Sequence, residues 1–441
     1  MAPVLPEPPL SEVLPYMMEF VQSVCSLPEV KLNPYRDLTG PALLETYLSR
    51  YKPSRRRNLE QGLLKPLPKR ARIKAFTKVE GVGRRGPRNI CPFDPEFNVR
   101  LGPIVFKVEK ILAGLPFLVK GLTIGQRNAR VSRLLSRPLL HATDFELYDL
   151  TMRLVVRALE RYVVAHLCTV DELEQFDACM ESLRNNKFEH VSGFVVSYLM
   201  MRFSGEPGTS IFNGMFHAFR VWLSAKREGY EFDPYAFLVE GDDGLDGLTP
   251  TAEIVIRDSV YLGLTVKVST HTSLYTADFL ARHFYPRYNG VGSCADLVRS
   301  LRGYHLSKQS NVRACDVPSL IVAKALSYMA TDYHTPVLGA IAWAHMNKYR
   351  AAVKPKDLQA ALTVQEYRIS LSDLSLRDLW SAPPPDVDPV AAQIVSYHSG
   401  ISTPTLRKIH AEWVSYGLGL TGLPPPIRIS PREGAENLVV V

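Results

Sequence analysis

The residues best suited to chemistry follow a short apolar run at positions 236–240, where the chain reads Gly241-Asp242-Asp243. The run predicts a buried strand, and Gly241 allows a tight turn at its end. Adjacent carboxylates repel each other, and a divalent cation bound between them would offset that repulsion. Carboxylate oxygens suit Mg²⁺, which commonly joins protein carboxylates to the phosphates of a substrate. The stretch therefore indicates metal-dependent chemistry on phosphates.

The same region also fits part of a calcium-binding loop. Positions 1, 5, 6 and 12 of that pattern are filled by Asp242, Asp246, Gly247 and Glu253. Position 3 is Gly244, which has no side-chain ligand, and the loop follows a strand-like run rather than a helix. These departures make the calcium loop the weaker interpretation.

Two segments further upstream place polar residues where one element gives way to the next. An apolar pair leads into Asp144 and a helical pattern follows, which predicts a strand, a turn and a helix. An Asp at such a junction is ordinarily a helix N-cap. The second segment, Ser204-Gly205-x3-Thr209-x3-Asn213, is a turn that runs into a helix. It is either a plain loop with a cap or a flexible loop whose backbone and hydroxyls face a ligand.

The elements expected around these residues are short strands and longer helices. Residues 264–268 alternate as a strand does. Residues 86–98 are rich in turn formers and are not expected to form a regular helix. Helical patterns occupy parts of four stretches, namely 99–136, 160–190, 252–261 and 295–380.

Composition narrows the class of protein. A chain of 441 residues is long enough for two or three domains, or for one large subdivided domain. Its net charge of +8 agrees with an acidic partner, nucleic acid above all. The six cysteines include no Cys-x-x-Cys pair, so neither a zinc site nor a disulfide framework is expected. No apolar run approaches the ~20 residues that a membrane span requires.

Positive charge is concentrated in residues 51–88, which hold thirteen Lys or Arg against two Glu. A charge run is often only a solvated face. Apolar residues interrupt this one, so we expect a folded surface. A folded surface this basic suits phosphates and favours a role with nucleic acid or nucleotides.

In chain order, these features are the basic segment, Asp144-x4-Asp149, the Ser204 segment and Gly-Asp-Asp. Their order and spacing resemble motifs A, B and C in the palm of viral RNA-dependent RNA polymerases of positive-strand RNA viruses. Residues 263–268 are similar to motif D, and residues 279–282 stand where motif E would be. Residues 78–102 resemble motif F of the tombusvirus-like and nodavirus-like groups. Phe93 departs from that pattern, in which a basic residue often follows the proline.

The resemblance implies an α+β right-hand polymerase fold, with fingers, a palm built on a small antiparallel sheet flanked by helices, and a helical thumb. It places the basic N-terminal part of the fingers at 1–140 and a fingers insertion at 159–190. The palm would comprise 141–158 and 191–290, and the thumb with a C-terminal tail would comprise 291–441.

The resemblance also implies template-directed RNA synthesis that replicates a viral RNA genome. In two-metal nucleotidyl transfer, a pair of Mg²⁺ or Mn²⁺ ions ~3.5–4 Å apart activates the attacking oxygen and stabilises the leaving one. Asp144 and Asp242 would hold the two ions, with Asp243 in support. Lys267 stands where a proton donor to pyrophosphate would be, although a solvent-facing lysine on an edge strand is an equally good interpretation.

Other matched positions would handle the nucleotide. Asp149 and Asn213 resemble the pair that recognises the ribose 2′-hydroxyl, since a carboxylate and an amide can together bond that group. The residues that would support the nascent base pair and template are Ser204, Gly205 and Thr209. The residues that would meet the triphosphate are Lys78, Arg85 and Arg88.

Two other functions compete with this one. A reverse transcriptase is disfavoured because Asp149 and Asn213 suit a 2′-hydroxyl, and because Gly241 stands where that family usually has another residue. An RNA-binding protein with a degenerate, inactive palm would have no reason to keep three costly carboxylates together.

The partners that the resemblance implies are RNA template and product and ribonucleoside triphosphates. Replication would occur in the host cytoplasm, at membranes to which a viral or host protein would anchor this chain.

Overall fold

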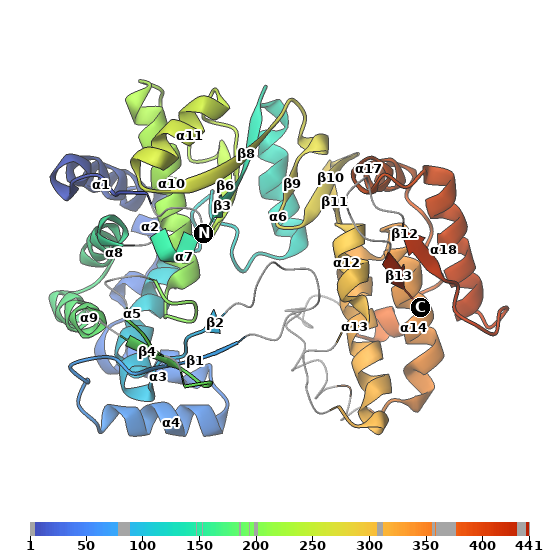
Figure 1. The fold of residues 1–441 in the computed structure, drawn as a ribbon, viewed down its shortest axis with the longest axis horizontal. Coiled ribbons are helices and arrows are strands. Elements are labelled where there is room, and N and C mark those ends of the chain that lie inside the picture. Colours follow the sequence, from blue (N-terminus) through green and yellow to red (C-terminus); the bar gives the residue numbers. More distant parts are fainter. Residues whose placement is uncertain are drawn as a thin grey trace. The chain divides into compact units, whose positions relative to one another are not determined.

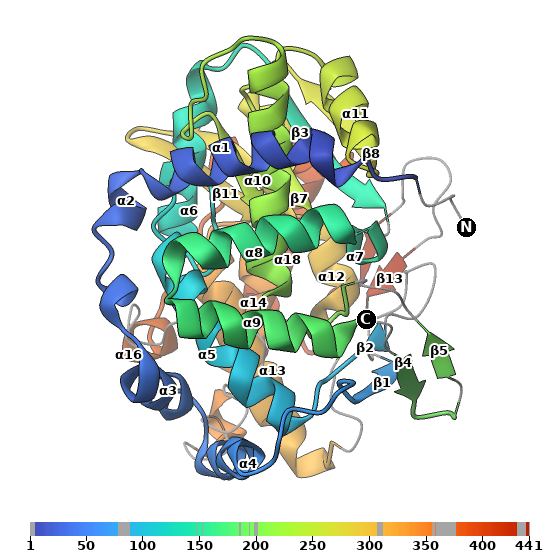
Figure 2. The same ribbon diagram turned by 90° about the vertical axis from the view of Figure 1, so that its left-hand side faces the viewer.

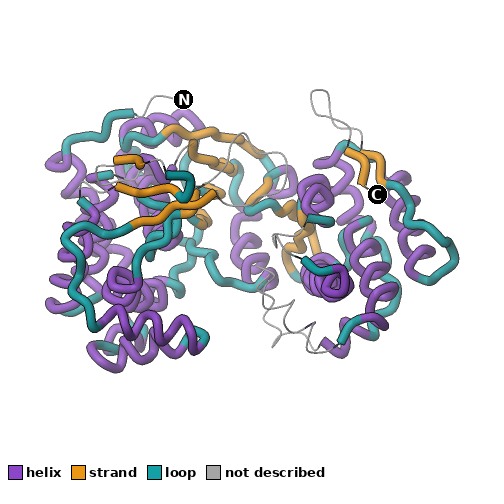
Figure 3. The backbone as a smooth tube through the Cα atoms, turned by 60° about the horizontal axis from the view of Figure 1, so that its bottom comes forward, coloured by secondary structure: helices purple, strands orange, loops and turns teal. Residues whose placement is uncertain are grey.

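The computed structural model describes residues 5–77, 89–146, 148–151, 153–184, 187–193, 195–197, 202–306, 312–354, 358, 376–429 and 438–440. The described residues form two compact units, of which the first ends at Ser273 and the second begins at Leu274. Helices make up most of both units, and the strands are gathered into small sheets (Figure 3). The described residues therefore have the mixed α+β character that the resemblance implies.

Helices dominate the first unit (Figure 1). They are α1 (Leu10–Cys25), α2 (Pro28–Lys31), α3 (Gly40–Ser49), α4 (Pro53–Leu63), α5 (Pro95–Leu112), α6 (Ile124–Val131), α7 (Tyr148–Thr151), α8 (Leu154–Leu167), α9 (Val170–Leu183), α10 (Thr209–Arg227) and α11 (Ala252–Tyr261). The helices α1, α8 and α9 lie one below another beside α10 (Figure 2). The helix expected at 252–261 is confirmed as α11.

The start of α5 corrects one expectation. The helix begins at Pro95, so the prediction that residues 86–98 contain no regular helix is wrong for residues 95–98. A proline suits the first helical position, because its φ is already helical and its missing N–H would have no partner there. Proline alone therefore did not mark a turn at this point.

The four-stranded sheet that carries the Gly-Asp-Asp stretch is antiparallel, with strand order β6-β7-β3-β8. Its strands are β3 (Leu140–Glu146), β6 (Phe237–Glu240), β7 (Asp243–Asp246) and β8 (Thr265–His271). The strands expected before Gly241, around Asp144 and at 264–268 are thus confirmed. The small antiparallel sheet expected for this part of the chain is present.

A second four-stranded sheet has the order β2-β1-β4-β5. Its strands are β1 (Ile73–Thr77), β2 (Asn89–Ile90), β4 (Lys187–His190) and β5 (Val195–Ser197). The pairing of β1 with β4 is parallel, and the other two pairings are antiparallel. Residues far apart in the sequence therefore share this sheet.

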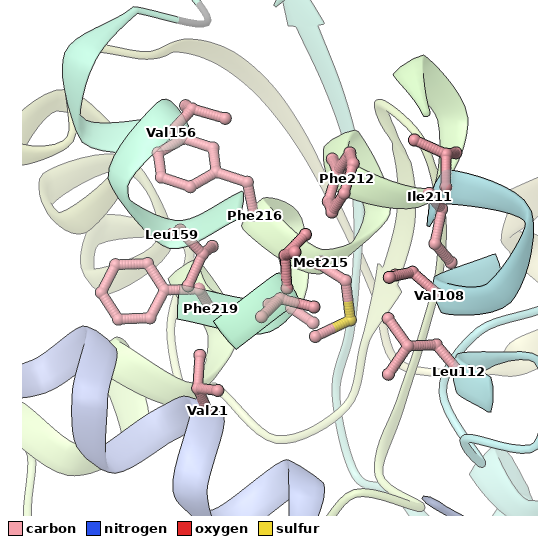
Figure 4. Close-up of a cluster of buried hydrophobic side chains, with 14 of the residues drawn as sticks. Val21, Val108, Leu112, Val156, Leu159, Ile211, Phe212, Met215, Phe216 and Phe219 are labelled. Carbon is pink, nitrogen blue, oxygen red and sulfur yellow. The ribbon is translucent and has the colours of Figure 1, made fainter. Parts of the chain in front are cut away.

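The core of the first unit surrounds α10, whose residues from Ile211 to Ala225 are all buried. A helix that is buried on every side packs against neighbours all round. Figure 4 shows side chains from four helices meeting at this point. They are Val21 of α1, Val108 and Leu112 of α5, Val156 and Leu159 of α8, and Ile211, Phe212, Met215, Phe216 and Phe219 of α10. Polar residues of α10 are buried in this core as well, and they include Asn213, His217 and Arg220.

The second unit consists of a small sheet, a set of helices and a two-stranded pair. Its sheet has the order β11-β10-β9, with β9 (Asp278–Phe279), β10 (Arg282–Arg287) and β11 (Gly290–Ala295). Its helices are α12 (Leu297–Tyr304), α13 (Val317–Asp332), α14 (Leu338–Tyr349), α16 (Leu376–Trp380), α17 (Pro389–Ser399) and α18 (Thr403–Gly417). The last pair is β12 (Ile427–Ile429) with β13 (Leu438–Val440).

A buried ion pair joins the sheet of the second unit to α13. Both guanidinium Nη atoms of Arg282 donate to the carboxylate of Asp332, at 3.1 Å and 3.0 Å. The main-chain N–H of Ala295 donates to the same carboxylate at 2.7 Å. One carboxylate thus anchors two neighbouring strands.

No helix in the described part of the chain combines the length and apolar character that a membrane span requires.

Candidate active site

The Gly-Asp-Asp stretch forms the tip of the β6–β7 hairpin. Glu240 pairs with Asp243, so Gly241 and Asp242 are the two residues of the turn. Gly241 has a φ of +66°, which glycine adopts without the strain that a side chain would add. The predicted tight turn at the strand end is therefore present, and it leaves Asp242 exposed.

The strand register brings the three predicted metal ligands to one end of the sheet. Thr143 on β3 pairs with Gly244 on β7, so the next residues outward, Asp144 and Asp243, lie opposite each other. Asp242 follows Asp243 in the turn. The expectation that Asp144 is simply a helix N-cap is not met, because Asp144 lies inside β3.

The donor set at this edge suits a hard cation. Carboxylates are the preferred ligands of Mg²⁺, and an exposed edge leaves room for substrate phosphates. In the part of the chain that the structure describes, no group of three or more His, Cys, Asp or Glu side chains is close enough to hold a metal ion. Asp144, Asp242 and Asp243 thus share an edge but do not form a closed coordination shell.

The helix α10 packs directly against the Gly-Asp-Asp hairpin. A Cβ placed on Gly214 would lie 3.6 Å from the main-chain nitrogen of Gly241. A Cβ placed on Gly244 would lie 2.6 Å from Nε2 of His217 and 2.6 Å from Oγ1 of Thr143, closer than real side chains allow. Glycine at position 244 is therefore required by the neighbouring imidazole.

His217 connects α10 to the strand that carries Asp144. Its Nε2 lies 3.1 Å from the hydroxyl of Thr143, the residue immediately before Asp144. Complete burial lowers the pKa of His217 to about 3, and the positive charge of Arg220 acts in the same direction. The imidazole is therefore neutral at physiological pH.

Asp246 has a structural role that excludes the calcium loop. Arg220 of α10 donates to Asp246 at 2.8 Å, and both side chains are buried. Thr249 donates to the same carboxylate through its hydroxyl at 2.6 Å and through its N–H at 3.0 Å. The calcium-loop interpretation is wrong, because these protein donors already occupy the oxygens that a cation would need.

Asp149 and Asn213, the residues expected to recognise ribose, are in contact. Asn213 Nδ2 donates to Asp149 Oδ1 at 3.1 Å. Tyr148 donates from its hydroxyl to the main-chain oxygen of Asn213 at 3.0 Å, which fixes α7 against α10. Asn213 is only 5% exposed, and its Oδ1 has no hydrogen-bond partner among the described residues. A buried acceptor without a partner is available to a ligand hydroxyl.

Electrostatic interactions link Asp149 to the hairpin tip. Burial raises the pKa of Asp149, and the negative charges of Asp242 and Glu206 raise it further. The hydrogen bond from Asn213 and the positive charge of Arg202 act in the opposite direction. The pair that could bind ribose and the carboxylate that could bind a metal therefore share one electrostatic environment.

Polar groups of the loop before α10 form hydrogen bonds mostly within the loop and to the neighbouring main chain. Thr209 donates from its hydroxyl to the main-chain oxygens of Glu206 at 2.9 Å and Phe203 at 3.3 Å. The N–H of Cys91 donates to the main-chain oxygen of Ser204 at 2.8 Å. Gly205 has a φ of +105°, and a Cβ there would lie 3.2 Å from the oxygen of Cys91. The loop is thus held close to the end of β2.

Four buried charged residues hold this loop to α8, and sequence reasoning missed all of them. Arg157 donates to Glu206 at 2.5 Å and 2.9 Å and to Glu160 at 3.0 Å. Arg202 donates to Glu206 at 3.3 Å and also to Glu160. Burial lowers the pKa of Arg202 to about 10. The charges cancel, which makes burying them tolerable. The only sequence signal was the spacing of Arg157 and Glu160 on one face of a helix.

Four predicted residues remain. Lys267 is among the described residues, and three basic residues are not. Lys267 pairs with Asp144 across β8 and β3, and its ammonium forms an ion pair with Glu146 at 2.6 Å. Its side chain is 68% exposed. The three basic residues expected to meet the triphosphate lie outside the described residues, and they are Lys78, Arg85 and Arg88.

The fold matches that of a viral RNA-dependent RNA polymerase. One similar solved structure is the polymerase of a human picobirnavirus, at 15% identity and a TM-score of 0.58, covering 80% of this chain and 76% of that chain. Another is an insertion-loop deletion mutant of a human picobirnavirus polymerase, at 14% identity and a TM-score of 0.55, covering 80% and 78%. No family model and no curated protein matches the sequence. At this identity the likeness shows the fold, and it does not distinguish the positive-strand group.

Removing one carboxylate should destabilise the buried charge cluster. Glu206→Gln should lower the free energy of unfolding by about 3–5 kcal/mol, because it leaves Arg157 and Arg202 with one carboxylate between them. Urea unfolding would measure the loss. The matched control is Asp177→Asn, which breaks an ion pair with Arg161 whose side chains are 53% and 38% exposed. That change should cost under about 1 kcal/mol. Equal losses in the two variants would contradict the prediction.

The lowered pKa of His217 should make the stability of the protein depend on pH. Native His217 stays neutral down to about pH 3, whereas an unfolded histidine gains its proton near pH 6.5. The unfolded state therefore binds more protons across this window, and stability is lost as pH falls from about 6.5 towards 3. His217→Gln should make the loss shallower by up to about 1.4 kcal/mol per pH unit. Urea unfolding of both proteins from pH 7 to 4 would test this, and parallel curves would argue against it.

Proposed function

We propose that this protein is an RNA-dependent RNA polymerase that copies a viral RNA genome by two-metal nucleotidyl transfer. The observation that carries the proposal is the hydrogen bond between Asp149 and Asn213, with the charge of Asp242 acting on the same carboxylate. A ribose-binding pair beside a carboxylate-rich sheet edge is the arrangement that polymerising ribonucleotides needs. The match in fold to viral polymerases supports it.

The carboxylates at the sheet edge have the first role in this proposal. Asp144 and Asp242 would hold two Mg²⁺ or Mn²⁺ ions, with Asp243 in support. When bound, such ions activate the attacking 3′-oxygen and stabilise the leaving pyrophosphate. The packing of α10 on the hairpin and of His217 on Thr143 keeps both strands in register while the exposed carboxylates meet substrate.

The nucleotide is handled by residues on three elements. Asn213 Oδ1 would accept a hydrogen bond from the ribose 2′-hydroxyl, while its Nδ2 remains bonded to Asp149. Ser204, Gly205 and Thr209 would shape the surface for the nascent base pair through the main chain of their loop. The triphosphate would meet three basic residues, which are Lys78, Arg85 and Arg88.

Lys267 would act as the proton donor to pyrophosphate, after its ammonium leaves the ion pair with Glu146 when substrate binds.

We further propose that the virus belongs to the positive-strand group. The fingers would comprise residues 1–140 and 159–190, the palm 141–158 and 191–290, and the thumb with the C-terminal tail 291–441. RNA template, RNA product and ribonucleoside triphosphates are the proposed partners. The proposed location is the host cytoplasm, at membrane-associated replication complexes with an anchoring viral or host protein.

Nucleotide incorporation on a single-stranded RNA template, with Mg²⁺ or Mn²⁺, tests the proposal directly. Wild-type protein should form template-dependent product, and Asp242→Asn should lower the rate by several orders of magnitude. Asp171→Asn, an exposed change on α9, is the control and should keep full activity. Product from Asp242→Asn would mean that the site is placed wrongly. No product from wild-type protein that still binds RNA would favour an RNA-binding protein with an inactive palm.

Ribose selection is the next expected outcome. Asn213→Ala removes both the amide that orients Asp149 and the free acceptor, so the preference for ribonucleotides over 2′-deoxyribonucleotides should fall about ten- to a hundredfold. The measurement is the ratio of kcat/KM for the two sugars. The change should come mainly from slower ribonucleotide incorporation. A ratio equal to that of the wild type would remove Asn213 from ribose recognition.

A further inference from the structure

The sheet β2-β1-β4-β5 has one buried face and one open face. Along β1, Ile73 and Ala75 are buried, whereas Lys74 and Phe76 point the other way and are exposed. The same alternation continues on β4, where His190 lies beside Ala75 and is buried. Figure 2 shows β1, β4 and β5 side by side in the first unit. The open face is therefore a continuous surface across several strands.

The open face carries apolar side chains beside charged ones. Phe76 is 42% exposed and pairs with Ile90, which is half-buried. Val195 on β5 is 59% exposed and pairs with Glu189, which in turn pairs with Lys74. A solvent-facing sheet surface is normally polar. The ring of Phe76 is therefore an exposed aromatic surface on a sheet face that also carries charged side chains, and such a ring can stack on a flat ligand.

Exposed cations lie on one side of these apolar residues. The exposed ones on and just before β1 are Lys69, Arg70, Arg72 and Lys74. Three carboxylates offset them in part. Glu189 lies on the face. Burial raises the pKa of Asp94, and the charge of Glu96 raises it further, whereas the charges of Arg72 and Lys74 act in the opposite direction. Glu96 is already paired with Lys65 at 2.8 Å. Positive charge remains in excess.

We propose that the open face of this sheet binds single-stranded RNA, with Phe76 stacking on a base and the cations of β1 contacting phosphates. Single-stranded nucleic acid exposes both a flat apolar base and a charged backbone, and an aromatic residue flanked by Lys and Arg matches both. A duplex hides its bases and could use only the cations. The surface thus fits an unpaired strand and not a duplex.

The inference adds an RNA contact to the polymerase proposed above but does not depend on catalysis. Binding can be measured without metal or nucleotide, on protein carrying Asp242→Asn. Loss of nucleotide incorporation and loss of strand binding are then separate results. A protein that binds RNA through this face without polymerising would keep the inference and remove the proposed function.

Fluorescence anisotropy with a short labelled oligoribonucleotide would test the stacking. Phe76→Ala should weaken binding by about five- to a hundredfold, and Phe76→Trp should restore it. Leu64→Ala, which removes an 86% exposed side chain from the end of α4, should have no effect. Thermal unfolding would show that the variants are folded. Equal weakening by Phe76→Ala and Phe76→Trp, or no weakening by either, would overturn the proposal.

Salt dependence would test the cations. Arg72→Gln and Lys74→Gln should each reduce the slope of log affinity against log salt by about 0.7, whereas Phe76→Ala should leave the slope unchanged. Arg57→Gln on the exposed part of α4 is the matched control and should leave the slope as it is. Equal slope changes in all three Gln variants would mean that RNA responds to the overall positive charge of the protein and not to this face, which would overturn the proposal. A change of oligomeric state on Phe76→Ala, without loss of RNA binding, would instead assign the face to a second copy of the chain.

Discussion

The burial of α10 on every side is the constraint on which the first unit depends. Water does not reach the buried polar side chains of this helix, so the contacts that three of them make with other elements stabilise its place in the core. Asn213 bonds to Asp149, His217 lies against Thr143, and Arg220 bonds to Asp246. Each of these contacts ends on a residue within or beside a predicted catalytic segment. Holding one helix in an apolar core thereby aligns the segments that carry the candidate chemistry.

The buried charges around the loop before α10 extend the same reasoning. An apolar set of side chains would cost less to bury than Arg157, Glu160, Arg202 and Glu206. Charged groups, however, accept only a narrow range of geometries, because any displacement leaves a buried charge unpaired. We infer that the cluster fixes where the loop lies relative to α8. The charge of Arg202 also acts on the carboxylate of Asp149, so the position of the loop affects the pair of residues proposed to bind ribose.

Much of the geometry around the Gly-Asp-Asp turn could be predicted from the sequence, because apolar runs and glycines act on their immediate neighbours in the chain. The apolar run and Gly241 predicted a strand with a tight turn, and the turn is present with Asp242 at its tip. Spacing also predicted a helix at 252–261, and that helix has those bounds. The pairing of Asp149 with Asn213 followed from resemblance rather than from spacing, and the two side chains are in contact. Local signals failed at Pro95, which begins a helix instead of marking a turn.

By itself, the sequence determined the elements and the order of the polar residues along the chain, since propensity and periodicity act over a few residues. Tertiary structure alone decided which of those residues meet. Glycine at position 244 is required by His217, and the cluster around Arg202 joins α8 to a loop distant in sequence. The open face around Phe76 combines residues of β1 and β4, which lie more than a hundred positions apart in the chain. Such contacts depend on how distant segments pack against one another. The resulting burial then decides how much free energy an unpaired charge or hydroxyl would cost.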